Sequence, residues 1–133
     1  MLIKLTGFFP LSALVAMTAG CGDIDPAEGR ARLHLPPENY VADVTRGFAE
    51  YQAFCSTCHG PVGRGSRQGP PLVDKTYEPS HHPDMSFHLA VKNGVRQHHW
   101  NFGDMPARTN VNPEATADIA AYIRELQVRA GIN

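Results

Sequence analysis

A five-residue stretch, Cys55-Ser56-Thr57-Cys58-His59, constrains this chain more than any other feature of its sequence. Cys-x-x-Cys-His is the pattern of covalent c-type haem attachment, in which two thiols bond to the porphyrin and the histidine reaches the iron. On a helical turn, the three-residue spacing puts Cys55 and Cys58 on one side. A redox dithiol or half of a zinc site would need a βαβ pattern or a second cysteine pair, and the sequence suggests neither.

The other face of the iron needs a ligand, and Met105 is the strongest candidate. It lies in the stretch Phe102-Gly103-Asp104-Met105-Pro106-Ala107. A thioether opposite a histidine is the ligand pair of electron-transfer haem proteins and raises the reduction potential. Met85 is a weaker candidate because no comparable loop surrounds it, and one of the nearby histidines is a further alternative.

The order of these motifs resembles that of a class I, monohaem cytochrome c over roughly residues 44 to 130. Besides the attachment motif and the Met-Pro-Ala loop, the resemblance rests on Gly69-Pro70-Pro71-Leu72 and on a final helix that carries Tyr122. It implies an all-α fold packed around one covalently attached haem c.

The resemblance also assigns roles to individual residues. Cys55 and Cys58 would carry the haem, and His59 and Met105 would bind its iron. The carbonyl of Pro70 would accept the other ring N–H of His59, which fixes the orientation of a ligand ring. A second implied contact joins Gly47 of the first haem-domain helix to Tyr122 of the last.

Apolar spacing independently predicts three helices and no strand. The first covers about 43–54, the second 84–93, between Pro83 and Gly94, and the third begins at Pro113 after an Asn112 cap. The apolar stripe of the first helix and its approach is Val41, Val44, Phe48 and Tyr51, and that of the last is Ile119, Tyr122, Ile123 and Leu126.

The loops between these helices contribute the remaining candidate haem contacts. Trp100 and Phe102 precede Met105 and are predicted to wall the distal pocket, although Trp100 is also suited to anchoring a partner protein. In the glycine- and proline-rich loop after His59, Arg64 or Arg67 either pairs with a haem propionate or stays exposed.

Residues 1–20 have the pattern of a secretory signal peptide. Lys4 precedes an apolar stretch that ends in small residues before Cys21. This end resembles a bacterial lipoprotein processing site, which implies a lipid-modified Cys21 and a membrane anchor. The alternative is ordinary cleavage nearby, which leaves Cys21 as a free or dimer-forming thiol.

The rest of the chain is predicted to form a flexible part and one domain. Residues 21–40 are interpreted as the anchor cysteine and a flexible tether, and residues 41–133 as the haem domain. Export agrees with haem attachment, which bacteria perform outside the cytoplasmic membrane, so we expect a periplasmic or cell-surface protein.

Five histidines lie between positions 81 and 99, which is unusual for a small haem domain. They could be exposed or hydrogen-bonded side chains around the pocket, one could replace Met105 on the iron, or pairs could bind copper or zinc. These five histidines are His81, His82, His88, His98 and His99.

Together these features predict a one-electron carrier and no enzymatic activity of its own. The formal net charge of −1 disfavours nucleic acid as a partner. Redox proteins are the expected partners, for the protein either alone or as a subunit of a larger oxidoreductase. The alternatives are a peroxidase-like haem enzyme with a distal site that can be vacated, and a sensing or metal-handling module that uses the histidines.

Overall fold

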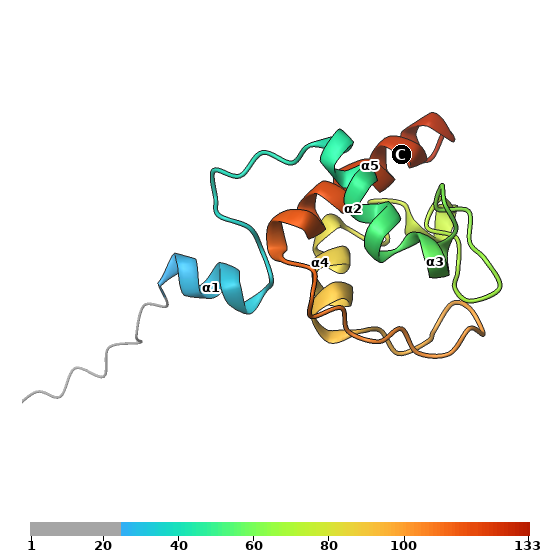
Figure 1. Ribbon diagram of the computed structural model, residues 1–133, viewed down its shortest axis with the longest axis horizontal. Coiled ribbons are helices and arrows are strands. Elements are labelled where there is room, and N and C mark those ends of the chain that lie inside the picture. The colour runs from blue at the N-terminus through green and yellow to red at the C-terminus, as the bar shows by residue number, and fades with distance from the viewer. Residues whose placement is uncertain (1–24) are drawn as a thin grey trace, which may run out of the picture.

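The computed structural model describes residues 25–133, which form helices joined by long loops (Figure 1). The elements are, in chain order, α1 (Pro26–Arg32), α2 (Val44–Phe54), α3 (Ser56–His59), the 3-10 helix η1 (Lys75–Tyr77), α4 (Asp84–Asn93) and α5 (Pro113–Arg129). The one extended pairing among the described residues is an isolated antiparallel bridge between Val95 and Met105. The predicted all-α class is therefore confirmed. The predicted signal peptide and Cys21 lie outside the described residues.

The three predicted helices begin and end where local signals placed them. The Asp43 carboxylate caps α2, and Asn112 caps α5 by accepting the backbone N–H of Ala115 at 2.8 Å. Pro113 occupies the first turn of α5, where its missing N–H costs no hydrogen bond. Gly94 ends α4 with a φ of 74°, a conformation that glycine adopts without strain.

Helices α2 and α5 cross so closely that Gly47 is required at the contact. A Cβ added to Gly47 would lie 2.0 Å from the carbonyl oxygen of Asp118 and 3.0 Å from the Cβ of Tyr122. Below this crossing, the rings of Tyr51 and Tyr122 lie with their centroids 5.4 Å apart. The contact that the family resemblance implied between Gly47 and Tyr122 is present.

The apolar stripe predicted along α2 is buried at only one of its four positions. Tyr51 has no exposed surface, whereas Val41, Val44 and Phe48 are 80%, 40% and 50% exposed. The reason is the direction of the crossing: α5 covers the face of α2 that carries Gly47 and Tyr51, which are four residues apart. Phe48 reaches only the edge of this interface, where its ring meets the ring of Tyr122 edge-on.

The predicted flexible tether is wrong from residue 25 onward. Helix α1 forms there with Asp25 as its N-cap, and the segment after it is held to the rest of the fold. His34 Nε2 lies 3.2 Å from Thr116 Oγ1, and His88 Nδ1 donates to the His34 carbonyl at 2.6 Å. The seven-residue helix is too short to give a sustained sequence pattern, and its partners are remote in sequence.

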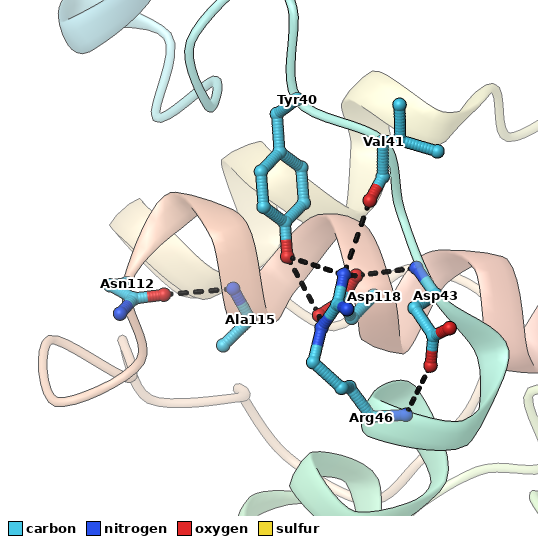
Figure 2. Close-up of polar contacts among 7 residues, drawn as sticks. All are labelled: Tyr40, Val41, Asp43, Arg46, Asn112, Ala115 and Asp118. Atoms are coloured by element: carbon cyan, nitrogen blue, oxygen red, sulfur yellow. Dashed lines mark hydrogen bonds and ion pairs between the residues drawn. The ribbon is translucent and has the colours of Figure 1, made fainter.

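A buried carboxylate, Asp118, joins the start of α2 to α5 (Figure 2). It accepts hydrogen bonds from the Tyr40 hydroxyl at 2.8 Å, the Asp43 backbone N–H at 2.7 Å and the Arg46 Nε at 2.8 Å. Burial acts to raise the pKa of Asp118, but the hydrogen bonds, above all that from Arg46, outweigh it and hold this pKa below its usual value.

Asp118→Asn is expected to destabilise the fold by about 2 kcal/mol at neutral pH, because the amide keeps the shape of the side chain but loses its charge-assisted hydrogen bonds. The folded-state pKa of Asp118 is lowered, so its contribution is complete above the unfolded pKa of about 3.9 and is lost as pH falls through the folded pKa. The difference in urea midpoint between wild type and variant should therefore shrink between about pH 6 and about pH 3.

The matched control for this prediction is Glu38→Gln, at an exposed carboxylate before α2. This variant is expected to unfold like the wild type at both pH values. A midpoint difference for Asp118→Asn that stays constant or grows on acidification would contradict the role given to its charge.

Candidate cofactor site

The predicted attachment motif lies at the junction of α2 and α3. Cys55 follows the last residue of α2 and caps α3, and its carbonyl accepts the backbone N–H of His59 at 2.9 Å. This single turn of helix carries His59 into the interior, where 9% of it is exposed, and leaves Cys58 at the surface. Neither Cys55 nor Cys58 forms a disulfide.

The His59 ring is oriented by the loop that follows the motif. Its Nδ1 lies 2.9 Å from the carbonyl oxygen of Pro70, and because a carbonyl only accepts, Nδ1 carries the proton. Burial lowers the pKa of His59, and the Pro70 hydrogen bond opposes this in part. The ring is therefore held neutral at neutral pH with the Nε2 lone pair available to a metal. This contact is the one that the family resemblance implied.

Gly69 lets this loop lie directly against α3. A Cβ at this position would approach the carbonyl oxygen of Cys58 to 2.9 Å, so a larger residue would push the loop away. The Pro70 carbonyl would then move from the His59 ring. Gly69 therefore contributes to ligand orientation through the backbone.

The protonation state of Cys55 opposes the redox-dithiol interpretation. Burial raises the pKa of the Cys55 thiol to about 11. Reactive dithiols and zinc ligands depend on a lowered thiol pKa and a stable thiolate. Before haem is attached, Cys55 therefore stays protonated at neutral pH and forms part of an apolar wall.

A cavity of about 450 Å³ opens beside α3 and α4 and brings the predicted cofactor residues together. This volume is within the range of small-molecule and cofactor sites. Apolar side chains from α4 and α5, among them Leu89, Val91 and Ile119, form much of its wall. The seven residues predicted to hold haem or wall its pocket line it, namely Cys55, Cys58, His59, Pro70, Trp100, Phe102 and Met105.

Met105 reaches this cavity from a different segment than His59. In the view of Figure 1, α3 lies above and the loop that follows α4 runs below. The Met105 backbone is fixed by two hydrogen bonds to Val95, each 2.9 Å long. Gly94 allows this pairing, because a Cβ there would lie 2.5 Å from the Met105 carbonyl oxygen. The sequence identified Gly94 as a helix end, but not as a support for Met105.

Two buried donors at the cavity fit the acidic edge of a haem. Among the described residues, Trp100 Nε1 and Arg108 Nε are the buried side-chain nitrogens or oxygens without a hydrogen-bond partner, and both residues line the cavity. A buried donor without a partner costs free energy, so such groups indicate a ligand that accepts hydrogen bonds. Together with the apolar walls, the paired thiols and His59, they show that the residues present fit haem.

The arginine at the cavity is Arg108, which the sequence did not single out. Its backbone N–H donates to the Val91 carbonyl at 2.7 Å, which brings the segment after Met105 against α4. Arg64 and Arg67, the two arginines considered for a propionate contact, are exposed and are not among the cavity residues. Sequence pattern offers no signal for Arg108, since its position depends on this tertiary contact.

The histidines between 81 and 99 divide into two groups. His88 is buried in α4 and directed at the His34 carbonyl, away from the cavity. His82, His98 and His99 line the rim of the cavity, and His81 lies beside them. Desolvation lowers the pKa of His99, and the neighbouring imidazoles lower it further. Met85, the alternative thioether, is not among the cavity residues.

An all-α body with a cavity that contains a Cys-x-x-Cys-His motif defines a haem protein of the c type. The sequence matches the family described as Cytochrome c over residues 44–127, and the chain therefore belongs to the cytochrome c family. Membership implies a covalently bound haem c, and the members are generally electron carriers that act outside the cytoplasm. No curated protein matches the chain.

None of the helices between residues 25 and 133 combines the length and the apolar character needed to cross a membrane.

Proposed function

We propose that this protein carries single electrons through a haem c attached to Cys55 and Cys58, with His59 and Met105 as the two axial ligands of the iron. The observation that carries the proposal is the cavity that these four residues share. Two thiols, a neutral imidazole and a thioether are the groups that a His/Met-ligated haem c requires.

The residues of the chain contribute orientation and a dry environment. Bound haem supplies one reversible one-electron centre. The hydrogen bond to Pro70 keeps His59 in a fixed orientation, and the bridge to Val95 does the same for the Met105 backbone. Apolar walls exclude water and the thioether favours the reduced iron, so both raise the potential and keep reorganisation small.

The protein is further proposed to be exported, to face the periplasm and to exchange electrons with other redox proteins. The exposed position of Cys58 in the cavity wall supports electron exchange with partners. It marks where the haem edge would reach the surface, and a redox protein could dock there. A lipid-modified Cys21 would hold the domain at a membrane, as its position after a signal-like stretch suggests.

Met105→Ala tests the distal ligand. The variant is expected to lose the sulfur-to-iron band of the oxidised spectrum, because no thioether remains at the iron. Its reduction potential should fall by on the order of 0.1 V or more, within the range of roughly 0.8 V that axial ligands control. Optical spectra and a redox titration of the haem-loaded protein measure both effects.

Met85→Ala is the matched control, since this methionine lies in the first turn of α4 and is not among the cavity residues. It should keep the sulfur-to-iron band and the wild-type potential. Loss of the band in Met85→Ala, or its survival in Met105→Ala, would show that the ligand is assigned to the wrong residue.

A haem enzyme with a distal position that can be vacated is the second candidate. It is favoured by one observation, the presence of His82, His98 and His99 at the cavity rim, where an imidazole could assist proton transfer. Tight binding of carbon monoxide or cyanide to the resting protein, with peroxide turnover, would support it over the carrier. A six-coordinate haem that resists both ligands would reject it.

A further inference from the structure

Three histidines from two separate segments converge outside the iron site. His81 and His82 lie between η1 and α4, and His99 lies in the loop between Val95 and Met105. One ring nitrogen from each of the three lies within 4.8 Å of the others. The ring centroids of His81 and His82 are 4.6 Å apart, and His99 lies 5.3 Å from the first and 5.1 Å from the second.

The limit of 4.8 Å on the distances between these ring nitrogens is close to the separation of ligand nitrogens in a metal site. With metal–nitrogen bonds of 2.0–2.1 Å, neighbouring ligand nitrogens lie about 2.9 Å apart in the square-planar geometry typical of Cu²⁺ and about 3.3 Å apart in a tetrahedral site. His81 and His99 are exposed, so rotation about their side-chain bonds can close the remaining gap without moving the backbone. Metal binding would therefore require adjustment of these side chains only.

His82 is already oriented as a metal ligand. Its Nδ1 lies 2.8 Å from the carbonyl oxygen of Thr76, so Nδ1 carries the proton and the Nε2 lone pair is available. Donation of the second ring N–H to a carbonyl is the usual way in which proteins fix a ligating histidine. The His59 ring is held by Pro70 in the same manner.

The backbone around His82 is held to α5 by Arg124. This side chain donates to the carbonyl of His82 and, at 2.7 Å, to that of Tyr77, and it forms an ion pair with Asp84 at 2.8 Å. The backbone N–H groups of His81 and His82 also share the Glu78 carbonyl at 3.0 Å and 2.8 Å. Two of the three imidazoles therefore project from a fixed turn.

The composition of the cluster indicates the class of metal. The group contains three imidazoles and no carboxylate, which disfavours calcium and magnesium because both prefer oxygen. His98 borders it, with its ring centroid 4.2 Å from that of His99, and its Nδ1 donates to the Arg96 carbonyl at 2.8 Å. His98 could therefore supply a fourth imidazole ligand beside the three of the cluster.

We propose that His81, His82 and His99 bind one divalent transition-metal ion, with Cu²⁺ preferred over Zn²⁺, at the rim of the haem cavity. Imidazole suits both ions, and the general affinity order places Cu²⁺ first. His82 and His99 also line the cavity, so the ion would lie beside the haem. This site is additional to the proposed electron transfer and rests on the assignment of Met105, rather than one of these three histidines, as the distal iron ligand.

The test adds Cu²⁺ alone to the haem-loaded, oxidised protein, purified without a histidine tag and freed of metal with a chelator. Wild type should retain one Cu²⁺, with nitrogen hyperfine structure in its electron paramagnetic resonance. The variant His81→Gln/His82→Gln/His99→Gln should bind about a hundredfold more weakly or worse, because even a change to the groups that orient a ligand costs roughly 10- to 100-fold. Isothermal titration gives the affinities.

His34→Gln is the matched control, because this histidine is not a member of the cluster and contacts Thr116 instead. It should keep the wild-type copper affinity. Unchanged haem absorbance in the triple variant shows that it is folded and that its iron ligands are intact. Wild type that retains no copper, or equal affinity in wild type and triple variant, overturns the site, and displacement of Cu²⁺ by an equal concentration of Zn²⁺ overturns the preference.

Discussion

Cys55→Ala/Cys58→Ala is expected to abolish covalent haem and, with it, the stable fold. Without the two thiols no thioether bond joins the porphyrin to the chain, so the haem can dissociate and leave the cavity of about 450 Å³ empty. The apolar walls that would pack against the haem are then exposed to water, which removes much of the hydrophobic stabilisation of a domain this small. A pyridine haemochrome assay measures the haem, and circular dichroism measures the helix content.

Thr57→Ala is the control for this result, because Thr57 is exposed and lies between the two cysteines. It should attach haem and fold like the wild type. Single replacement of either cysteine leaves one thiol and is expected to give an intermediate haem yield. Full covalent haem in the double variant would disprove the attachment assignment.

Gly47→Ala is expected to lower the stability of the haem-loaded protein by about 2 kcal/mol, although alanine favours helices. The new methyl group would lie 2.0 Å from the Asp118 carbonyl oxygen, so α2 and α5 must separate. Overpacking of this kind costs roughly 3 kcal/mol, and the gain in helix propensity returns about 1 kcal/mol. The midpoint of thermal unfolding should fall by about 10 °C.

Thr45→Ala controls for helix propensity, because it places alanine at an exposed position of the same helix. Its unfolding midpoint should stay at or slightly above the wild-type value. If Gly47→Ala also unfolded at the wild-type temperature, the close crossing of α2 and α5 would not be needed for stability.

The sequence predicted those parts of the structure that depend on local signals. Asn112 followed by Pro113 located the start of α5, and Gly94 located the end of α4, because caps and breakers act over a few residues. The Cys-x-x-Cys-His motif and the Met-Pro loop are also local patterns. They identified residues of the cavity wall because the spacing of these residues alone indicates haem binding.

The sequence did not predict contacts that join remote segments. Arg108 enters the cavity because its backbone pairs with Val91 of α4, and no pattern around residue 108 records that pairing. The convergence of His99 with His81 depends likewise on how two loops fold back, so five histidines were visible but their partners were not. The exposure of Val41 and Val44 shows the converse, since apolar spacing alone does not say which face of α2 the crossing helix α5 covers.

The ordered segment from α1 to Tyr40 bears on how far the domain could travel if Cys21 is its membrane anchor. Only four residues, 22–25, separate Cys21 from Pro26, the first residue of α1, and the five residue steps from Cys21 to Pro26 span at most about 18 Å. The haem domain would then stay close to the lipid surface, because no long flexible linker would allow it to move away. Redox partners would have to approach the membrane surface. The rate at which they meet the haem domain would then depend more on how the domain rotates than on how far it moves from the membrane.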